Sequence, residues 1–257
     1  MDVLELKMLG KTFGGLQAVE NINFKIQKGD IFGLIGPNGA GKTTTFNLIT
    51  GVYPPSNGGI LFEGGDIAGM KTHEIAKMGI ARTFQITSLF KEYSVLENVL
   101  TGFHLSLKSD LLSSLFPGKR KILRKKAITE KAMEMLSFVE IEHLKDEKAK
   151  NLSFGHQRLL GISIALALDP KLLMLDEPVG GLNPAEIKMI IDMVGKIRDR
   201  RRDIAILLVE HNMPVVMSIC NRIVVMNFGV KIAEGSPEEI RTNPDVIRAY
   251  LGSSYDA

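Results

Sequence analysis

The chain has little cysteine and no tryptophan: among its 257 residues, Cys220 is the one cysteine. A single cysteine cannot form an intrachain disulfide, which excludes a disulfide-stapled secreted fold. Residues 1–11 lack the basic start and apolar run of a secretory signal, so we expect a protein of the reducing cytoplasm. With 45% hydrophobic and 24% charged residues, the composition excludes intrinsic disorder and predicts a globular chain.

Long hydrophobic runs are also missing. The longest, 159–168 and 204–209, are far shorter than the roughly 20 apolar residues that cross a bilayer, so no transmembrane span is expected. The net charge is only +3, although basic residues cluster in 119–126 and 196–202. We interpret both clusters as solvated helix faces, and membrane headgroups are the other partner that they fit. Neither contains an aromatic residue, so nucleic-acid binding is not expected.

The N-terminal part predicts two kinds of strand. Short alternating runs bounded by glycine-rich turns indicate a small antiparallel sheet formed by 3–8, 22–26 and 60–63. Between them, the apolar run 31–35 leads into a glycine-rich loop, and 43–49 follows as a helix with Gly51 at its end. The order is therefore strand, loop, helix.

The C-terminal part predicts a parallel core. Residues 172–175 and 204–209 are aliphatic runs without alternation, as in strands buried on both faces. The helix between them begins with Asn183 as N-cap, Pro184 at the first position and Glu186 placed for a capping box. Its apolar face is formed by Ile187, Ile190, Ile191, Val194 and Ile197. A closing hairpin is expected from 223–227 and 230–233.

The middle of the chain differs, because 93–144 has helical periodicity, the first basic cluster and no strand pattern. We expect one domain over 1–257, with a core formed by 1–85 and 160–257 and an inserted helical subdomain at 86–159. The predicted fold class is α/β, with a parallel core sheet, an N-terminal antiparallel β subdomain and that helical insert.

A phosphate-binding motif follows the first predicted core strand. It matches GxxxxGK followed by Ser or Thr, and consists of Gly36, Pro37, Asn38, Gly39, Ala40, Gly41, Lys42 and Thr43. The glycines let backbone N–H groups and the helix N-terminus face phosphate oxygens. Lys42 adds positive charge at the β- and γ-phosphates, and the Thr43 hydroxyl is a ligand for Mg²⁺.

Two carboxylates, Asp176 and Glu177, end the aliphatic run 172–175. The carboxyl ends of parallel strands face the crevice where α/β folds bind ligands. We therefore expect Asp176 near the metal and Glu177 placed to orient or deprotonate the attacking water.

A third motif extends this pattern to a family resemblance. Residues 152–157, LSFGHQ, are similar to the LSGGQ signature, so the chain resembles the ATP-binding subunits of ABC transporters. Gln85 matches that family's Q-loop, Gly181–Asn183 its D-loop and His211 its switch histidine. The resemblance covers nearly the whole chain and implies the P-loop NTPase fold of an ABC ATPase.

The resemblance implies a set of roles for ATP and Mg²⁺ in a head-to-tail pair of subunits. Phe13 takes the position of the adenine-stacking aromatic, with Val19 and Thr44 as further nucleotide contacts. Catalysis is assigned to Glu177, His211 and Gln85. Mg²⁺ is assigned to Thr43, Gln85 and Asp176. The residues that complete the site of the opposite subunit are Ser153, Phe154, Gly155, His156 and Gln157.

Finer features look like the branched-chain amino acid importer branch: 51–55, the basic insertion 119–126, 180–184 and 249–252. This likeness implies uptake of branched-chain or related amino acids at the cytoplasmic face of the plasma membrane. The implied partners are transmembrane permease subunits, a second ATP-binding subunit, identical or paralogous, and a periplasmic binding protein. A permease coupling helix is expected in the groove 86–99.

Three residues depart from the family pattern. Phe154 replaces a glycine, His156 replaces the usual glutamine, and Asn183 stands where aspartate is more common. An imidazole beside a triphosphate changes charge near its unperturbed pKa of about 6.5, so we hypothesise that His156 makes turnover pH-sensitive. An unchanged pH profile between about 5.5 and 8 in a His156→Gln variant would overturn this hypothesis.

Two other functions fit parts of the sequence. A soluble ABC-type ATPase of translation or DNA maintenance usually has tandem cassettes or long coiled coils, and neither is found in 257 residues. A P-loop GTPase or small-molecule kinase needs a motif such as NKxD or an acceptor lid, and leaves 152–157 unexplained.

Overall fold

The structure of the protein, a computed structural model, describes residues 2–83, 89–106 and 119–251. The contacts within the chain gather into two compact units, which are described one at a time. Unit 1 is Met1–Arg82, Lys171–Gly180 and Val194–Ala257, and unit 2 is Thr83–Pro170 and Gly181–Met193. The boundaries at 86 and 159 drawn from the sequence stay a prediction.

Unit 1 contains a sheet that is parallel except at one edge. In the described residues its strand order is β10-β9-β3-β8-β7-β6, and only β10 runs antiparallel to its neighbour. The strands are β3 (Ile31–Ile35), β6 (Ile80–Arg82), β7 (Leu172–Asp176), β8 (Ala205–Val209), β9 (Arg222–Asn227) and β10 (Val230–Gly235). Strands β3, β7 and β8 are buried at every position, which confirms the predicted parallel core.

The second sheet of unit 1 is antiparallel, in the order β2-β1-β4-β5. Its strands are β1 (Asp2–Phe13), β2 (Leu16–Gln27), β4 (Asn57–Phe62) and β5 (Gly65–Asp66). The predicted sheet is confirmed, but the strand predicted at 3–8 is too short. Met8 has φ 48° and the register shifts between Leu6 and Leu9, so a bulge breaks the alternation on which the prediction rested.

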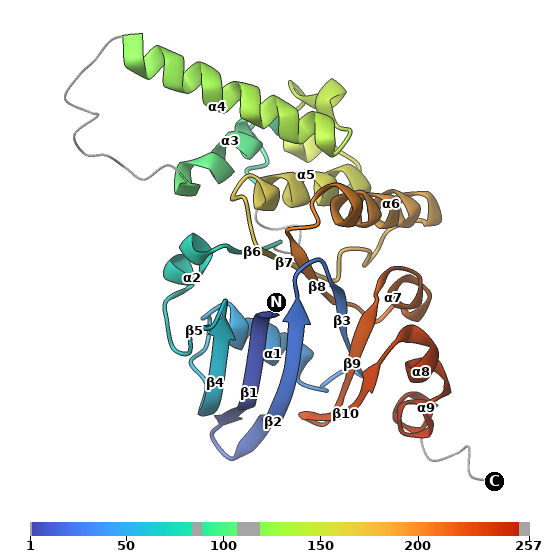
Figure 1. Cartoon of the computed structure of the whole chain (residues 1–257). Coiled ribbons are helices and arrows are strands. Elements are labelled where there is room, and N and C mark those ends of the chain that lie inside the picture. Colours follow the sequence, from blue (N-terminus) through green and yellow to red (C-terminus); the bar gives the residue numbers. More distant parts are fainter. Residues whose placement is uncertain (1, 84–88, 107–118, 252–257) are drawn as a thin grey trace. The chain divides into compact units, whose positions relative to one another are not determined.

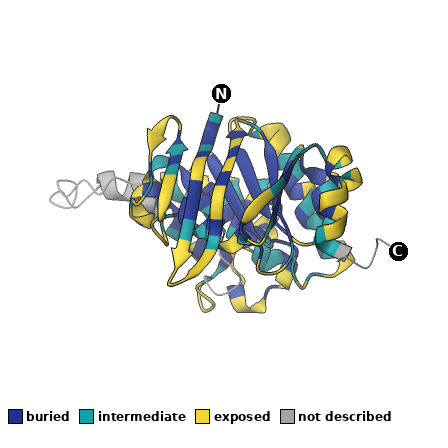
Figure 2. Cartoon of the chain, turned by 90° about the horizontal axis from the view of Figure 1, so that it is seen from below, coloured by how far each residue is buried: buried dark blue, intermediate teal, exposed yellow. Residues whose placement is uncertain are grey.

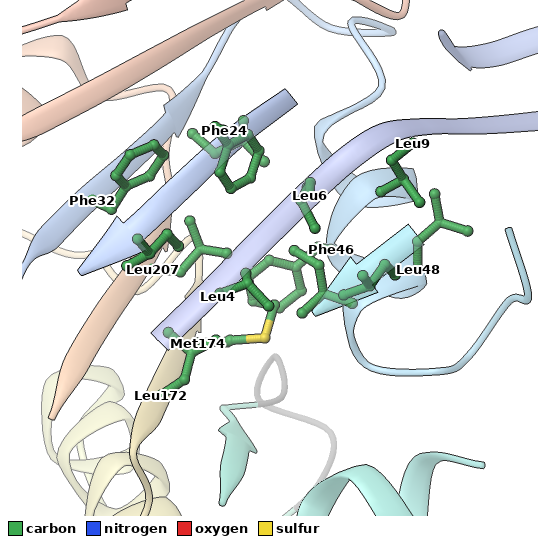
Figure 3. Close-up of a cluster of buried hydrophobic side chains, with 14 of the residues drawn as sticks. Leu4, Leu6, Leu9, Phe24, Phe32, Phe46, Leu48, Leu172, Met174 and Leu207 are labelled. Carbon is green, nitrogen blue, oxygen red and sulfur yellow. The ribbon is translucent and has the colours of Figure 1, made fainter. Parts of the chain in front are cut away.

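One hydrophobic core lies between these two sheets of unit 1. Figure 3 shows Leu4 and Leu6 of β1 beside Phe46, with Met174 and Leu207 from the parallel sheet pointing into the same cluster. Phe24 and Phe32 stack at 5.1 Å between ring centroids, so β2 and β3 meet through aromatic rings. The core thereby fixes the strand that precedes the phosphate-binding motif.

Short helices complete unit 1 (Figure 1). They are α1 (Lys42–Ile49), α2 (Thr72–Met78), α7 (Met213–Ile219), α8 (Pro237–Thr242) and α9 (Pro244–Leu251). Helix α1 follows the glycine-rich loop as predicted, and Gly51 with φ 71° lies just after its C-cap, Thr50. Strands β9 and β10 form the predicted hairpin, with Phe228 and Gly229 both at positive φ in its turn.

Unit 2 is helical in its described residues, as the sequence predicted for 93–144. Its helices are α3 (Val95–Ser106), α4 (Lys119–Phe138), α5 (Phe154–Leu166) and the first part of α6 (Pro184–Arg200), with 3₁₀ turns η3 (Glu142–Leu144) and η4 (Ala149–Asn151). Helices α3, α4 and α5 are in contact with one another, and they carry the buried residues Val99, Ala132, Leu136 and Leu160. The predicted N-cap of α6 is confirmed, because Asn183 Oδ1 accepts hydrogen bonds from Ala185 N and Glu186 N, both at 3.0 Å.

Burial in the second half of β2 follows the two-residue period of a strand. Figure 2 shows both buried and exposed positions along the antiparallel strands, and in β2 they alternate from Ile22 to Gln27. None of the helices in 2–83, 89–106 and 119–251 is both long enough and apolar enough to span a membrane.

Candidate functional site

The glycine-rich loop 36–41 joins β3 to α1 in unit 1. Gly36 has φ 150° and Gly41 has φ 96°, which are backbone conformations that glycine adopts readily and residues with a side chain rarely adopt. A Cβ on Gly36 would lie 2.1 Å from Met226 O, and one on Gly41 would lie 2.5 Å from Ala18 O. Neighbouring backbone therefore requires both glycines. The resulting loop brings backbone N–H groups and the start of α1 together, an arrangement that binds phosphate.

Lys42 is the first residue of α1, and its side chain folds back over the loop. Its Nζ donates to Gly36 O at 2.6 Å and to Pro37 O at 2.9 Å. Burial lowers the pKa of the Lys42 ammonium, and the negative charge of Glu177 opposes part of that shift. The ammonium is thus held against two carbonyl oxygens of the loop, and a bound anion can replace these two hydrogen bonds.

Asp176 ends β7 and is buried, with 7% of its surface exposed. Its Oδ2 accepts a 2.7 Å hydrogen bond from Nη2 of Arg82, the last residue of β6. Arg82 Nη1 donates to Asn47 Oδ1 of α1 at 2.7 Å, and its guanidinium lies 4.6 Å from the ring centroid of Phe46. Arg82 therefore connects α1 with β7. The sequence did not reveal this role of Arg82, because its partners Asn47 and Asp176 lie 35 and 94 positions away in the chain.

Glu177 follows directly and has an unusual backbone. Its φ is 45°, a left-handed value that is uncommon for a residue with a side chain and recurs at functional sites. Its N–H donates to Val209 O at 2.9 Å, which joins the ends of β7 and β8. His211 Nδ1 lies 3.5 Å from Glu177 Oε1, and both side chains are open to solvent, at 59% and 39% exposure. The structure thus brings together two residues that the sequence had assigned to catalysis.

Glu210, the residue after β8, is a second carboxylate that the sequence analysis did not select. It is fully buried. Its Oε1 accepts from Val179 N at 3.0 Å, and its Oε2 accepts from His211 N at 3.1 Å and Asn212 N at 3.3 Å. The carboxylate therefore ties the loop after Glu177 to the segment that carries His211. In the sequence, Glu210 could have been identified from its position next to His211 at the end of an apolar run.

Phe13 lies at the end of β1 with 40% of its surface exposed. Its ring meets Tyr53 edge to face at 5.2 Å, and Lys11 Nζ lies 5.0 Å from its centroid. The exposed ring of Phe13 is suited to stacking on the flat base of a nucleotide. Val19 is fully buried in the core, which leaves direct contact with a base to Phe13. Thr43 is exposed and Thr44 is half-buried in the first turn of α1.

The signature segment 152–157 lies in unit 2, where Ser153 is the N-cap of α5. Ser153 Oγ accepts from His156 N at 3.3 Å and lies 3.2 Å from His156 Nδ1. Gln157 Nε2 donates to Leu152 O at 2.9 Å, and Phe154 is exposed. Gly155 N donates to Glu186 Oε1 of α6 at 2.9 Å, a contact that the sequence did not reveal. Ser153 and Gly155 thus share one helix terminus.

Gln85 and the first residues of the groove 86–99 lie outside the described residues. In the described part of that segment, Phe90 and Tyr93 stack at 5.1 Å between centroids, and both are exposed. The buried Asn98 braces them: its Nδ2 donates to Phe90 O at 3.0 Å, and its Oδ1 accepts from Phe90 N at 2.9 Å.

The oxygen donors of unit 1 fit a magnesium ion. No three His, Cys, Asp or Glu side chains gather into a metal-binding cluster in the described part of the chain. Mg²⁺ at nucleotide sites needs only one or two protein oxygens, since phosphates and water supply the rest. The Thr43 hydroxyl and the Asp176 carboxylate are hard oxygen donors of this kind. The ion pair of Asp176 with Arg82 indicates that the carboxylate accommodates a positive partner.

Comparison with known proteins agrees with this arrangement. The family model described as "ABC transporter" matches residues 19–180, well over half of the chain. The chain belongs to the ABC transporter family. As a member of this family it is an ATP-binding cassette subunit with ATPase activity. A second model, "Branched-chain amino acid ATP-binding cassette transporter", matches 230–256.

Individual members of the ABC transporter family are similar over nearly the whole chain. The high-affinity branched-chain amino acid transport ATP-binding protein LivG of Escherichia coli K12 is 44% identical, and BraF of Pseudomonas aeruginosa is 42% identical. Each match covers 98% of this chain and 98% of the relative. A crystal structure of the ADP conformation of an ABC transporter cassette superposes with a TM-score of 0.85 at 33% identity, covering 98% of this chain and 99% of that one. This likeness confirms the predicted fold class.

Proposed function

We propose that the chain binds Mg²⁺·ATP at residues 36–44 and hydrolyses it to power the uptake of branched-chain or related amino acids. Transmembrane permease subunits, a second ATP-binding subunit and a periplasmic binding protein would form the rest of the importer, with this chain at the cytoplasmic face of the membrane. The similarity to LivG and BraF, at 44% and 42% identity over 98% of the chain, supports this proposal over an ATPase of translation or DNA maintenance. The second family match, 230–256, supports the branched-chain amino acid branch.

The observation that carries the chemistry is the order of the sheet: the glycine-rich loop before Lys42 follows β3, Asp176 and Glu177 come at the end of β7, and these two strands lie on either side of β8. The negative charge of Glu177 also acts on the Lys42 ammonium. In the proposal, the N–H groups of Gly36–Thr44 surround the phosphates, and Lys42 turns from its carbonyl partners to the β- and γ-phosphates. Phe13 stacks on adenine. Bound at Thr43, Asp176 and Gln85, Mg²⁺ would neutralise charge on the β- and γ-phosphate oxygens.

Glu177 and His211 are the proposed catalytic pair. Glu177 accepts the proton of a water whose oxygen attacks the γ-phosphorus, while the bond to the β–γ bridging oxygen breaks and ADP leaves. His211, 3.5 Å from Glu177, keeps that carboxylate in position and contributes a donor towards the γ-phosphate. The Glu177 side chain is 39% exposed although it directly follows the fully buried strand β7, so its carboxylate is open to water, which supports this role.

A second subunit completes the proposed site. Ser153 and Gly155 of that subunit bind the γ-phosphate, with Phe154, His156 and Gln157 alongside. The exposed position of Ser153 at the start of α5 supports this role, since a helix N-terminus binds anions. ATP held by both subunits favours the closed pair, and loss of the γ-phosphate removes the bridge between them.

The transport proposal is tested by leucine uptake in host cells that lack this chain. Wild-type protein should restore uptake of labelled leucine, isoleucine and valine. Lys42→Ala should lower the restored uptake at least about tenfold, because charge at the γ-phosphate is lost. Uptake of lysine serves as the control and should not change. Full leucine uptake without the chain, or with Lys42→Ala, would contradict the proposal.

A further inference from the structure

Glu186 of α6 covers the start of α5 within unit 2. Its Oε1 accepts the 2.9 Å hydrogen bond from Gly155 N, and its Oε2 accepts from Asn183 N at 3.2 Å. One carboxylate therefore serves two helices: it closes the capping box of α6 and takes an N–H in the first turn of α5.

The contact is close and charged. A Cβ on Gly155 would lie 2.8 Å from Glu186 Cγ and 3.2 Å from its Cδ, so the side chain lies flat against the glycine. The N–H of Gly155 holds the pKa of the Glu186 carboxyl below its ordinary value, and the Ser153 hydroxyl adds to the effect. At neutral pH a negative charge thus lies against Ser153 and Gly155 of the signature segment.

These are also the groups that the proposed function assigns to the γ-phosphate of ATP on a second subunit. A carboxylate and a phosphate compete for the same N–H donors, since both are anions attracted to a helix N-terminus. Two such anions at hydrogen-bond distance from one N–H also repel each other. The carboxylate of Glu186 and an incoming γ-phosphate therefore cannot both bind Gly155 N.

We propose that in the free subunit the Glu186 carboxylate occupies the position that the γ-phosphate takes when two subunits pair. Glu186 holds Ser153 and Gly155 in the free subunit and must turn away when ATP arrives on the opposite subunit. This inference rests on the proposed function. Because the other oxygen of Glu186 binds Asn183 N, release of this side chain also loosens the D-loop, 181–183, which precedes α6. Capture of ATP by the signature segment and the conformation of 181–183 are coupled through this one side chain.

The test measures how much ATP is needed to pair two subunits. Glu177→Gln is the parent chain, because slow hydrolysis lets the ATP-bound pair accumulate. Glu186→Gln added to this parent should lower the ATP concentration for half-maximal dimer formation about fivefold, as a neutral amide holds Gly155 N about half as strongly as a carboxylate. Analytical ultracentrifugation over an ATP series gives this concentration, and Glu186→Ala should shift it in the same direction.

A matched control separates the effect of the Glu186–Gly155 contact from the effect of helix capping. Glu239 closes the capping box of α8 with Ser236, as Glu186 does for α6, but it belongs to unit 1, whereas the signature segment belongs to unit 2. Glu239→Gln should leave the ATP requirement unchanged. An unchanged or raised requirement in both Glu186 variants would overturn the inference and leave the proposed function standing. A parent that never pairs with ATP would overturn both.

Discussion

Arg82 is the charged partner of the buried Asp176. The Arg82 guanidinium makes a 2.7 Å ion pair with the Asp176 carboxylate and also donates a hydrogen bond to Asn47 Oδ1. We expect Arg82→Gln to lower the free energy of unfolding by about 3 kcal/mol, because Asp176 would stay buried without its charged partner. Urea unfolding measures this loss.

The exposed pair of Lys171 and Glu63 is the control for Arg82. Both side chains are about half exposed, so Lys171→Gln should change the free energy of unfolding by less than about 1 kcal/mol. Equal losses in the two variants would show that burial of the Arg82 pair has no special effect.

At the scale of elements, Glu210 links the loops that follow β7 and β8. In Glu210→Gln one oxygen becomes an amide NH₂ that faces backbone N–H donors. We expect a loss of about 2 kcal/mol in the free energy of unfolding, with kcat lowered and KM for ATP little changed. Glu177 and His211 would separate while the phosphate loop stays intact. Steady-state kinetics checks this split, and the exposed Glu238→Gln should behave as wild type.

Elements whose pattern is local could be predicted from the sequence. The strand 31–35, its loop and helix α1 follow from an apolar run, positive-φ glycines and a lysine at fixed spacing. The N-cap of α6 at Asn183 also depends only on neighbouring residues. These predictions were confirmed because the physical cause lies within a few positions of the chain.

Contacts between distant segments could not be predicted in this way. Arg82 and Asp176 are 94 positions apart, and Glu186 and Gly155 are 31 positions apart. No local pattern distinguishes these charged residues from others at a strand end or in a first helical turn. The bulge at Met8 is similar, since it depends on pairing with β2 and not on the alternation of β1 alone.

At the scale of the whole molecule, Cys220 reports unfolding of unit 1. Burial raises the pKa of its thiol from 9.0 to about 12, and the thiol is neutral and covered in the native state. We expect its reaction with a disulfide reagent at pH 8 to be about a hundredfold slower in native protein than in urea-unfolded protein. Equal rates would contradict the burial.

The same thiol predicts the direction of a pH effect on stability. The folded state holds the Cys220 proton more tightly, so its stabilising contribution is complete below about pH 9 and is lost as the pH rises towards 12. Urea unfolding at pH 8 and pH 10 should show a smaller decrease for Cys220→Ala than for wild type. The same decrease in both proteins would remove Cys220 as its cause.

The proposed mechanism divides the work between Lys42, which holds ATP, and Glu177, which acts on water. The most direct test measures ATP affinity and ATP hydrolysis on the same preparations of wild type and Glu177→Gln, with Mg²⁺ present. We predict that Glu177→Gln binds ATP as tightly as wild type and hydrolyses it at least about a hundredfold more slowly. Wild-type hydrolysis in that variant would contradict the account, as would absence of ATP binding by the wild-type chain.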